Sequence, residues 1–299
     1  MKKILVIGSS NTDMTVVSDR LPAPGETVLG GVFHMGPGGK GANQAVCASR
    51  LGADVTFVCK VGNDIFGDNA LAGYRAEGLD VSYVLRSAKP TGSALILVDR
   101  NGENEISVAP GANADFTVED IDRLEDVICG ADYLLLQLEI PVPCVVRAAE
   151  IAHAAGVFVI LNPAPACALP PQMSGNVSLM MPNRTELELL AGKPADSAAH
   201  IREAVMELVR QGVSQVVVTL GADGALVYRD GAFISVPARK VKAVDTTAAG
   251  DTFCGAVCVG LSEGLSLEEA AAFAAGASAL TVQKVGAQNS LPYRKDLTD

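Results

Sequence analysis

The sequence predicts an α/β protein with a central, mostly parallel sheet, helices on both faces of that sheet, and a small β-sheet lid. Short, continuous apolar runs alternate with longer segments of helical composition, which is the pattern of strands that helices bury on both faces. Two stretches break this alternation and have the composition of exposed β-structure. We expect these two stretches to leave the main sheet and form the lid.

The apolar runs provide the predicted strands of the main sheet, at residues 3–7, 55–61, 133–138, 157–161, 179–181 and 216–220. Helices are expected between them, at residues 41–51, 67–77, 142–155, 198–211 and 266–284. Strands joined through helices should run parallel, because a parallel pair needs a long crossover connection.

The lid is predicted from excursions at about residues 14–37 and 92–109. In the second excursion, Asn101-Gly102 separates residues 94–99 from 103–108, and Asn-Gly between two such runs predicts a β-hairpin. Because no internal repeat or linker divides the chain, we expect a single domain over residues 1–299.

Composition narrows the class of protein. The 299 residues are 49% hydrophobic and 19% charged, and the net charge of −11 argues against nucleic acid or a membrane as a partner. Seven scattered cysteines without a Cys-x-x-Cys pair indicate reduced thiols, and the apolar run at residues 4–7 is too short for a signal sequence or a membrane span. We therefore expect a cytoplasmic protein, in which an anionic substrate would need a local positive site.

Ligands of open parallel sheets bind beyond the carboxyl ends of the strands, and the first candidate residues follow the run 3–7. Asn11 and Asp13 offer donor and acceptor groups that suit the hydroxyls of a sugar. An Asx-rich turn would explain the same two residues.

Residues 36–45 form a glycine-dense entry to a helix and include Lys40 and Asn43. So many glycines predict a close approach of the backbone to a polar ligand, although a plain helix-entry turn is the structural alternative. An ordinary P-loop is excluded, because no Ser or Thr follows Lys40 and the Gly-x-x-x-x-Gly-Lys frame is absent.

Three later strand ends carry further candidates. Glu139 follows an apolar run and either contacts the substrate or marks the solvated end of the strand. Asn183 and Glu186 have the spacing of a helix capping box, and the same two residues would suit nucleotide phosphates and a hydrated Mg²⁺. The glycine-containing turn at residues 219–224 suits either a nucleotide or a hairpin.

The segment 245–253 carries the strongest signal for chemistry. It places small residues at a predicted loop-to-helix junction, where unpaired N–H groups and the helix dipole favour a phosphate. Asp251 could accept a proton there from an attacking hydroxyl. The structural alternative is that Asp251 is only a first-turn carboxylate.

Together these segments resemble the ribokinase-like, phosphofructokinase B type family of carbohydrate kinases. The resemblance spans nearly the whole chain in the family's order, through residues 8–13, 24–27, 38–45, 136–139, 162–166, 182–186, 219–221, 245–253 and 286–288. It implies the ribokinase-like α/β fold and ATP-dependent phosphorylation of a sugar. The variants Ala248-Ala249-Gly250-Asp251 and Asn162-Pro163-Ala164-Pro165-Ala166 favour D-ribose, with phosphate added at the 5-hydroxyl.

The resemblance also implies roles for individual residues. Ribose is expected under the lid at Asn11, Thr12, Asp13, Gly38, Gly39, Lys40, Gly41, Ala42, Asn43, Glu139 and Asp251. ATP is expected along Asn183, Glu186, Thr219, Leu220, Gly221, Ala222, Asp223, Gly224, Gly250 and Ala275. Backbone amides of Ala248, Ala249, Gly250 and Asp251 would form an anion hole, and the Asp251 carboxylate would take the proton of the sugar hydroxyl.

The remaining implied features are Mg²⁺, an activating monovalent cation such as K⁺, and a homodimer that forms through the lid. The K⁺ site is expected at Asp245, Thr247, Thr281, Lys284, Gly286 and Ser290, mostly through backbone carbonyls. One departure is Ala275, which stands where relatives often carry a polar residue beside adenine.

Other functions fit the sequence less well. Within the same family the alternatives are a fructokinase, a deoxyribokinase, a nucleoside kinase or a 2-keto-3-deoxygluconate kinase. A non-catalytic sugar sensor would lack the anion hole or the base, whereas both are present. A dinucleotide oxidoreductase would show Gly-x-Gly-x-x-Gly after the first strand, and this chain does not.

Overall fold

An eight-stranded sheet forms the centre of the computed structural model, which describes residues 2–297. Its strands lie in the order β14-β13-β12-β11-β10-β9-β1-β4. Their bounds are β1 Lys3–Ile7, β4 Asp54–Val58, β9 Tyr133–Leu136, β10 Phe158–Leu161, β11 Leu179–Met180, β12 Gln215–Thr219, β13 Ala225–Arg229 and β14 Ala232–Val236. All pairs from β4 to β12 are parallel, and β13 and β14 are added antiparallel at one edge.

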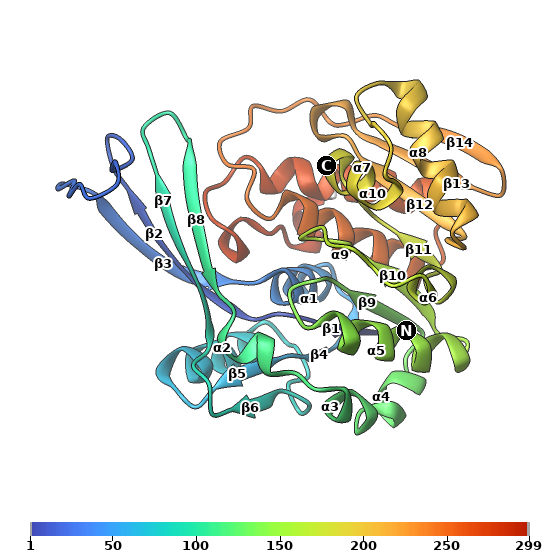
Figure 1. The fold of residues 1–299 in the computed structure, drawn as a ribbon, viewed down its shortest axis with the longest axis horizontal. Helices are drawn as coiled ribbons and strands as arrows, with labels where there is room; N and C mark the ends of the chain where they lie inside the picture. Colours follow the sequence, from blue (N-terminus) through green and yellow to red (C-terminus); the bar gives the residue numbers. More distant parts are fainter. Residues whose placement is uncertain (1, 298–299) are drawn as a thin grey trace.

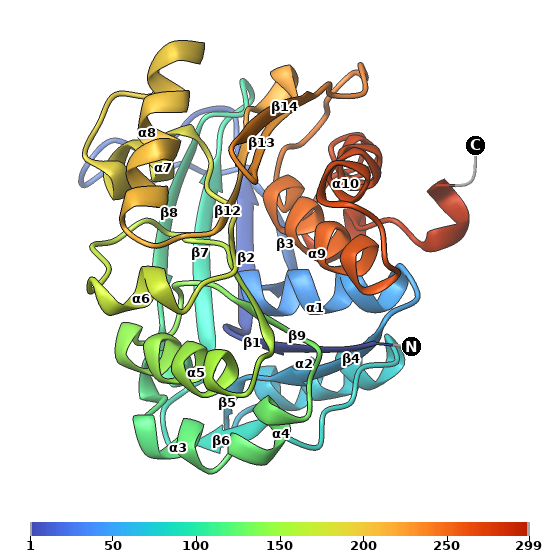
Figure 2. The same ribbon diagram turned by 90° about the vertical axis from the view of Figure 1, so that its right-hand side faces the viewer.

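Helices cover both faces of this sheet (Figure 2). Alternate residues of β1 enter different cores: Ile4 and Val6 pack with the first helix group, and Leu5 and Ile7 pack with the second. The first group is α1 Lys40–Arg50, α2 Ile65–Ala76, α9 Ala249–Ser262 and α10 Leu267–Thr281. The second includes α5 Val142–Ala154, α7 Arg184–Ala191 and α8 Ala198–Arg210. Burial on both faces explains why the predicted strands are continuously apolar.

A second sheet of four strands projects from this body (Figure 1). Its order is β3-β2-β7-β8, with β2 at Asn11–Val17, β3 at Val32–Gly38, β7 at Gly92–Val98 and β8 at Asn104–Ala109. Strands β7 and β8 form the hairpin that Asn101-Gly102 predicted. We call these four strands the lid.

Most predicted elements are confirmed within one or two residues, but the run at 55–61 is not one strand. It divides at Cys59 into β4 and β5, Lys60–Gly62, and β5 leaves the main sheet to pair with β6, Leu85–Ser87. The backbone carbonyl of Cys59 accepts a hydrogen bond from Leu85 instead of continuing the β1–β4 ladder. An apolar run cannot reveal this change of partner, because both halves are buried.

The remaining elements are short. They are α3 Val118–Asp122, α4 Glu125–Cys129, α6 Gln172–Gly175, and 3-10 turns at Gly111–Asp115, Gly221–Asp223, Gln288–Ser290 and Arg294–Leu297. No helix within residues 2–297 is long and apolar enough to cross a membrane.

Candidate active site

The first turn of α9 leaves backbone N–H groups free at the carboxyl edge of the sheet. The helix begins at Ala249 after Ala248, whose φ of 60° and ψ of 8° are left-handed, and no side chain caps this end. The first i to i−4 bond is made by Thr252 N–H to the carbonyl of Ala248. The N–H groups of Gly250 and Asp251 precede this bond and are therefore available to an anion.

The carboxylate of Asp251 is turned towards helix α1 and does not cap its own helix. Its Oδ2 accepts a hydrogen bond of 2.9 Å from Asn43 Nδ2, and its Oδ1 accepts one of 3.1 Å from Gln44 Nε2. Only 6% of Asp251 is exposed. Burial raises the pKa of Asp251, while the Lys40 charge and these two hydrogen bonds limit the rise. Asp251 lies in the first turn of α9, as the structural alternative expected, but its side chain bonds to α1 and does not cap α9.

The glycines before α1 allow the chain to pack against itself. Gly39 has a φ of 91°, and a Cβ added to it would lie 2.9 Å from the backbone nitrogen of Asn11. A Cβ on Gly41 would lie 2.5 Å from the nitrogen of Ser9. The glycines were predicted to allow a ligand close to the backbone. In the structure they allow the β1–β2 connection to pack closely against the start of α1.

Four carboxylates and one lysine interact beside this junction. Glu139 Oε2 accepts hydrogen bonds from Ser9 Oγ at 2.5 Å and from the Lys40 backbone at 2.9 Å. Burial, with the charges of Glu139 and Asp251, raises the pKa of Asp13 to about 6. Burial alone would lower the pKa of Lys40, but the charges of Asp251, Glu139 and Glu186 raise it above its ordinary value. The cluster suits neutral hydroxyls on one side and phosphate charge near Lys40 on the other.

Asn183 and Glu186 form a capping box at the start of α7. Asn183 caps α7 by accepting from Glu186 N–H at 2.8 Å, and Glu186 Oε2 accepts from Asn183 N–H at 2.8 Å. The capping-box explanation is therefore confirmed. Glu186 is also buried, which raises its pKa, and it is close enough to Lys40 to interact electrostatically. Thr219 lies beside Asn183 in an isolated β-bridge.

The turn at residues 219–224 closes an antiparallel hairpin between β12 and β13. Gly221 and Gly224 have φ values of 61° and 91°, and a Cβ on Gly224 would lie 2.1 Å from the Val236 carbonyl. Asp223 in this turn pairs with Arg184 at 2.6 Å. The hairpin alternative is thus confirmed, and it places the turn next to the start of α7.

Hydrogen bonds join some of the predicted cation residues. Asp245 accepts from Thr247 N–H at 2.9 Å and from Gly286 N–H at 2.8 Å, so the two segments meet at this carboxylate. Partial burial raises the pKa of Asp245, but these hydrogen bonds lower it more, so the pKa lies below its ordinary value. The hydroxyl of Thr281 instead contacts Thr252 at 2.9 Å, and that of Ser290 binds the Ala287 carbonyl. Within residues 2–297 no group of three His, Cys, Asp or Glu residues could hold a metal ion.

Several buried polar residues at the site were not predicted. Gln44 contacts Asp251, while Asn113 donates to Asn11 Oδ1 at 2.7 Å and Ser9 contacts Glu139. Gln44 had a detectable signal, because it lies one helical turn after Lys40 and next to Asn43. No sequence pattern pointed to Asn113, because it lies in a 3-10 turn that follows the lid and belongs to none of the predicted strand ends.

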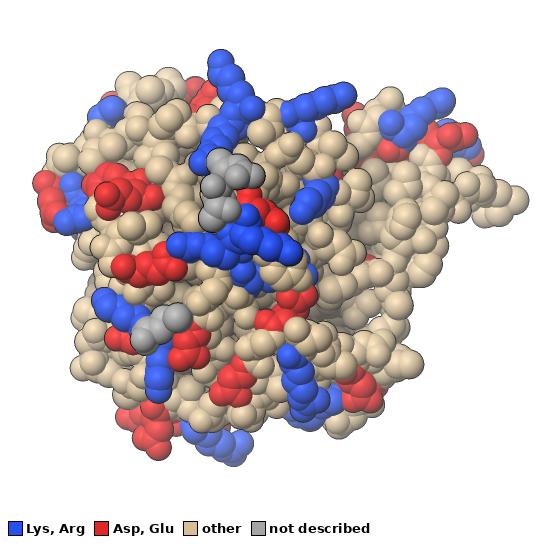
Figure 3. All heavy atoms as spheres, turned by 180° about the vertical axis from the view of Figure 1, so that it is seen from behind, with Lys and Arg blue, Asp and Glu red and all other residues tan. Residues whose placement is uncertain are grey.

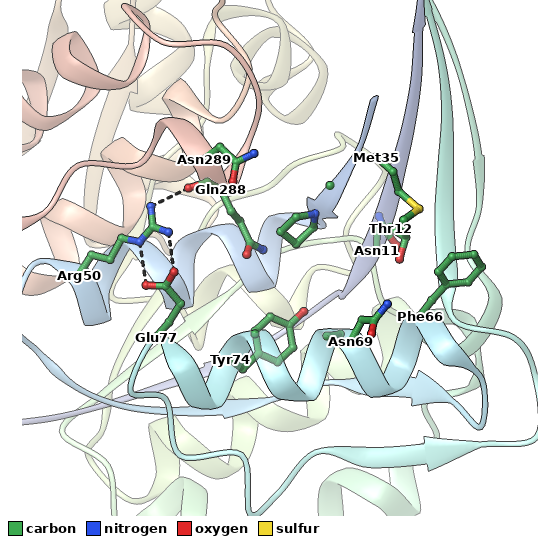
Figure 4. A pocket seen from close by; sticks show the side chains of 14 residues that line it. Asn11, Thr12, Met35, Arg50, Phe66, Asn69, Tyr74, Glu77, Gln288 and Asn289 are labelled. Atoms are coloured by element: carbon green, nitrogen blue, oxygen red, sulfur yellow. Dashed lines mark hydrogen bonds and ion pairs between the residues drawn. The ribbon is translucent and has the colours of Figure 1, made fainter. Parts of the chain in front are cut away.

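A separate pocket of about 270 Å³ lies at the base of the lid, between the lid and α2 (Figure 4). Arg50 lies at one end of this pocket (Figure 4), pairing with Glu77 at 2.6 Å and donating to the Gln288 carbonyl at 2.7 Å. Asn11 and Thr12 line this pocket, but Asp13 and Asp251 do not. Because neighbouring strand residues point to opposite faces, Thr12 is turned away from the face that carries Asp13.

Comparisons with known proteins agree with this geometry. The model of the pfkB family carbohydrate kinases matches residues 1–294. Ribokinase of Staphylococcus aureus (strain COL) is 39% identical over 298 residues, covering 99% of this chain and 98% of the relative. Deoxyribokinase of Salmonella typhi is 38% identical over 291 residues, covering 97% and 95%. The structure of Arabidopsis thaliana ribokinase complexed with ribose and ATP matches with a TM-score of 0.92 at 35% identity, covering 99% of this chain and 98% of that chain.

Proposed function

This chain belongs to the pfkB family of carbohydrate kinases, and on that premise we propose that it transfers a phosphoryl group from ATP to the 5-hydroxyl of D-ribose, giving ribose 5-phosphate and ADP. The observation that carries the proposal is the pairing of a buried, hydrogen-bonded Asp251 with the free amides at the start of α9. The similarity to ribokinases over nearly the full chain supports ribose as the sugar.

The sugar would bind between the lid and the start of α1. Asn43 uses its amide nitrogen on Asp251, and its buried Oδ1 has no partner among residues 2–297. A buried acceptor without a partner is costly, and a sugar hydroxyl would satisfy it. Asp13 and Glu139 would accept from further hydroxyls.

The proton of the attacking hydroxyl would pass to Asp251, and the phosphoryl group would meet the amides of Gly250 and Asp251. The Ala249 N–H, which was expected in the anion hole, donates to the Thr246 carbonyl at 3.2 Å. A loose transition state places charge on the peripheral oxygens, so fixed N–H donors at a helix start stabilise it. Lys40 adds a positive charge close to Asp251 and Glu186. Lys40 and the amides at the start of α9 are the positive groups that an anionic substrate would need in a chain of net charge −11.

The nucleotide would lie across the starts of α7 and of the β12–β13 turn. Mg²⁺ usually keeps several waters and needs few protein oxygens, so the buried carboxylate of Glu186 at the start of α7 is sufficient for a hydrated ion. When bound, Mg²⁺ would neutralise phosphate charge. Glu186 would hold its hydration shell, and Asn183 would contact the nucleotide phosphates.

An activating monovalent cation would bind beside Asp245. The donor set there consists of oxygens, which suits a hard cation such as K⁺, and Asp245 already ties residues 245–247 to Gly286. The side-chain hydroxyls of Thr281 and Ser290 are occupied elsewhere, so these two residues would contribute backbone carbonyls.

Two copies of the chain would associate through the lid, on the face that is turned away from Asp13. Strand register places Met35, Met14 and Leu95 in one row and Phe33, Val16 and Leu97 in the next. Phe33, Met35 and Leu95 are more than half exposed, at 59%, 53% and 57%. On the side of the molecule seen in Figure 3, the lid shows few charged residues away from its tip. Exposed apolar faces of this kind are typical of protein interfaces.

The cysteines suit a reducing compartment. All seven are free thiols, and four of them are buried in the first core group, at Cys47, Cys59, Cys254 and Cys258. This supports a cytoplasmic location for the enzyme.

The proposed function is tested by ADP release with a panel of acceptors: ribose, 2-deoxyribose, fructose, a nucleoside and 2-keto-3-deoxygluconate. We expect the highest kcat/KM with ribose, and a lower rate when K⁺ is replaced by Na⁺. No turnover of ribose, with turnover of another acceptor, would overturn the assignment of the sugar.

A further inference from the structure

The side chain of Gln44 is fully buried and makes three hydrogen bonds. Its Nε2 donates to Asp251 Oδ1 at 3.1 Å and to Asn162 Oδ1 at 3.0 Å, and its Oε1 accepts from Gln137 Nε2 at 2.6 Å. Since an ionised Asp251 carboxylate can only accept, the nitrogen of Gln44 must face Asp251 and its oxygen must face Gln137.

The partners of Gln44 are themselves fixed by the ends of three neighbouring strands. Gln137 follows β9, and Asn162 follows β10 and donates to the carbonyl of Met181 at 3.1 Å, just after β11. The oxygen of the Gln137 amide lies against Gly8, where a Cβ would come within 2.0 Å of it. A chain of amides therefore runs from the β11 end, next to the segment of Asn183, to the carboxylate of Asp251.

We propose that Gln44 is a positioning residue, held by Gln137 and Asn162, that fixes the rotation of the Asp251 carboxylate so that one oxygen lone pair faces the sugar hydroxyl. The inference rests on the proposed function and deepens it. The last torsion of an aspartate is broad, so the carboxylate needs outside partners to keep one orientation. Asn43 holds Oδ2 and Gln44 holds Oδ1. Proton transfer is efficient only when this geometry is kept.

The same hydrogen bond also stabilises the charged form of Asp251. The charged and titratable groups that face this carboxylate are Lys40 and Cys47 from α1, Asp13 from β2, Glu139 after β9, Glu186 from α7 and Cys254 from α9. None of these groups is changed by a substitution at position 44. A shift in the pH dependence of kcat in a Gln44 variant would therefore result from the loss of the hydrogen bond that Gln44 donates to Asp251.

The test compares Gln44→Met with the wild type and with Gln215→Met, a matched control at the opposite end of the sheet. We expect Gln44→Met to lower kcat at least tenfold, to change KM for ribose and for ATP less than threefold, and to move the acid limb of kcat to higher pH. Gln215→Met should behave as the wild type. A folded Gln44→Met enzyme with wild-type kcat and an unchanged acid limb would overturn the proposal.

Two more variants keep the test decisive if Gln44→Met does not fold. Gln137→Met leaves Gln44 in place but removes the contact that orients its amide, so we expect a smaller loss of kcat with the same direction of pH shift. Gln44→Glu would set two carboxylates side by side, where one is forced to hold a proton, and should be as inactive as a variant without the base. Wild-type kcat in both would refute the positioning role. Absence of ribose turnover in the wild type would instead refute the proposed function.

Discussion

Asp251 is the residue on which the proposed chemistry depends most. Replacing it with Asn keeps the size of the side chain and an oxygen for the Gln44 donor, but removes the proton acceptor. We expect Asp251→Asn to lower kcat by about a hundredfold or more, the scale on which a general base commonly matters. The measurement is steady-state ADP release, with ribose binding followed by thermal shift as the control for an intact site. Near wild-type kcat would remove Asp251 from the role of base.

Asp13 gives the site a pH dependence on the acid side. Its pKa is raised from 3.8 to about 6, chiefly by burial, and only the ionised form is a pure hydrogen-bond acceptor for a sugar hydroxyl. We expect kcat/KM for ribose to be constant above this pKa and to fall about tenfold per pH unit below it. The matched variant Asp13→Asn should have a low kcat/KM that lacks this limb. An acid limb that stays unchanged in Asp13→Asn would assign the titration to another group.

At this scale the sequence predicted individual side chains better than their partners. Asn43 and Asp251 were both expected at the site, but their direct hydrogen bond joins residues 208 positions apart. The spacing of residues within a short motif cannot predict a contact between segments so far apart in the sequence. Thr12 was expected with Asn11 and Asp13, yet strand alternation turns it to the opposite face of the lid.

At the scale of elements, the junction before α9 carries local strain. Ala248 has a φ of 60°, in the left-handed region that costs a non-glycine residue about 1 kcal/mol. We expect Ala248→Gly to raise the free energy of unfolding by about 1 kcal/mol, measured by urea denaturation. Ala249→Gly is the matched control, because Ala249 already lies in the helix, and it should not gain stability. An equal gain in both variants would show that the backbone angle of Ala248 is not the cause.

The same junction explains what the sequence could predict about elements. Small residues before Asp251 indicated a loop that enters a helix, and the structure starts α9 within this segment. The run at 55–61 was less informative, because burial on all sides gives one apolar pattern to two strands of different sheets. Periodicity reports which residues are buried, while the choice of neighbouring strand depends on the whole fold.

At the scale of the whole molecule, the lid is predicted to join two copies of the chain. Leu95→Asp places a charge in the exposed apolar row that includes Met35, and burying an unpaired charge at an interface is costly. We expect Leu95→Asp to shift the protein from dimer to monomer in light scattering after size-exclusion chromatography. Ile234→Asp, on the exposed edge strand β14, is the control and should leave the mass unchanged. A wild-type monomer, or a dimer that persists in Leu95→Asp, would exclude this interface.

The arrangement of the whole molecule is also what turns separate motifs into one site. Segments that follow β1, β9, β10, β11 and β12 meet at one edge because these strands are parallel, and the starts of α1 and α9 reach the same edge.

The central chemical claim is that ribose 5-phosphate forms at this edge. It is tested most directly by ³¹P NMR of the enzyme incubated with ATP and D-ribose. A phosphate ester signal split into a triplet by the two protons on C5 is the predicted result, whereas a doublet from a secondary hydroxyl, or inorganic phosphate alone, would contradict it.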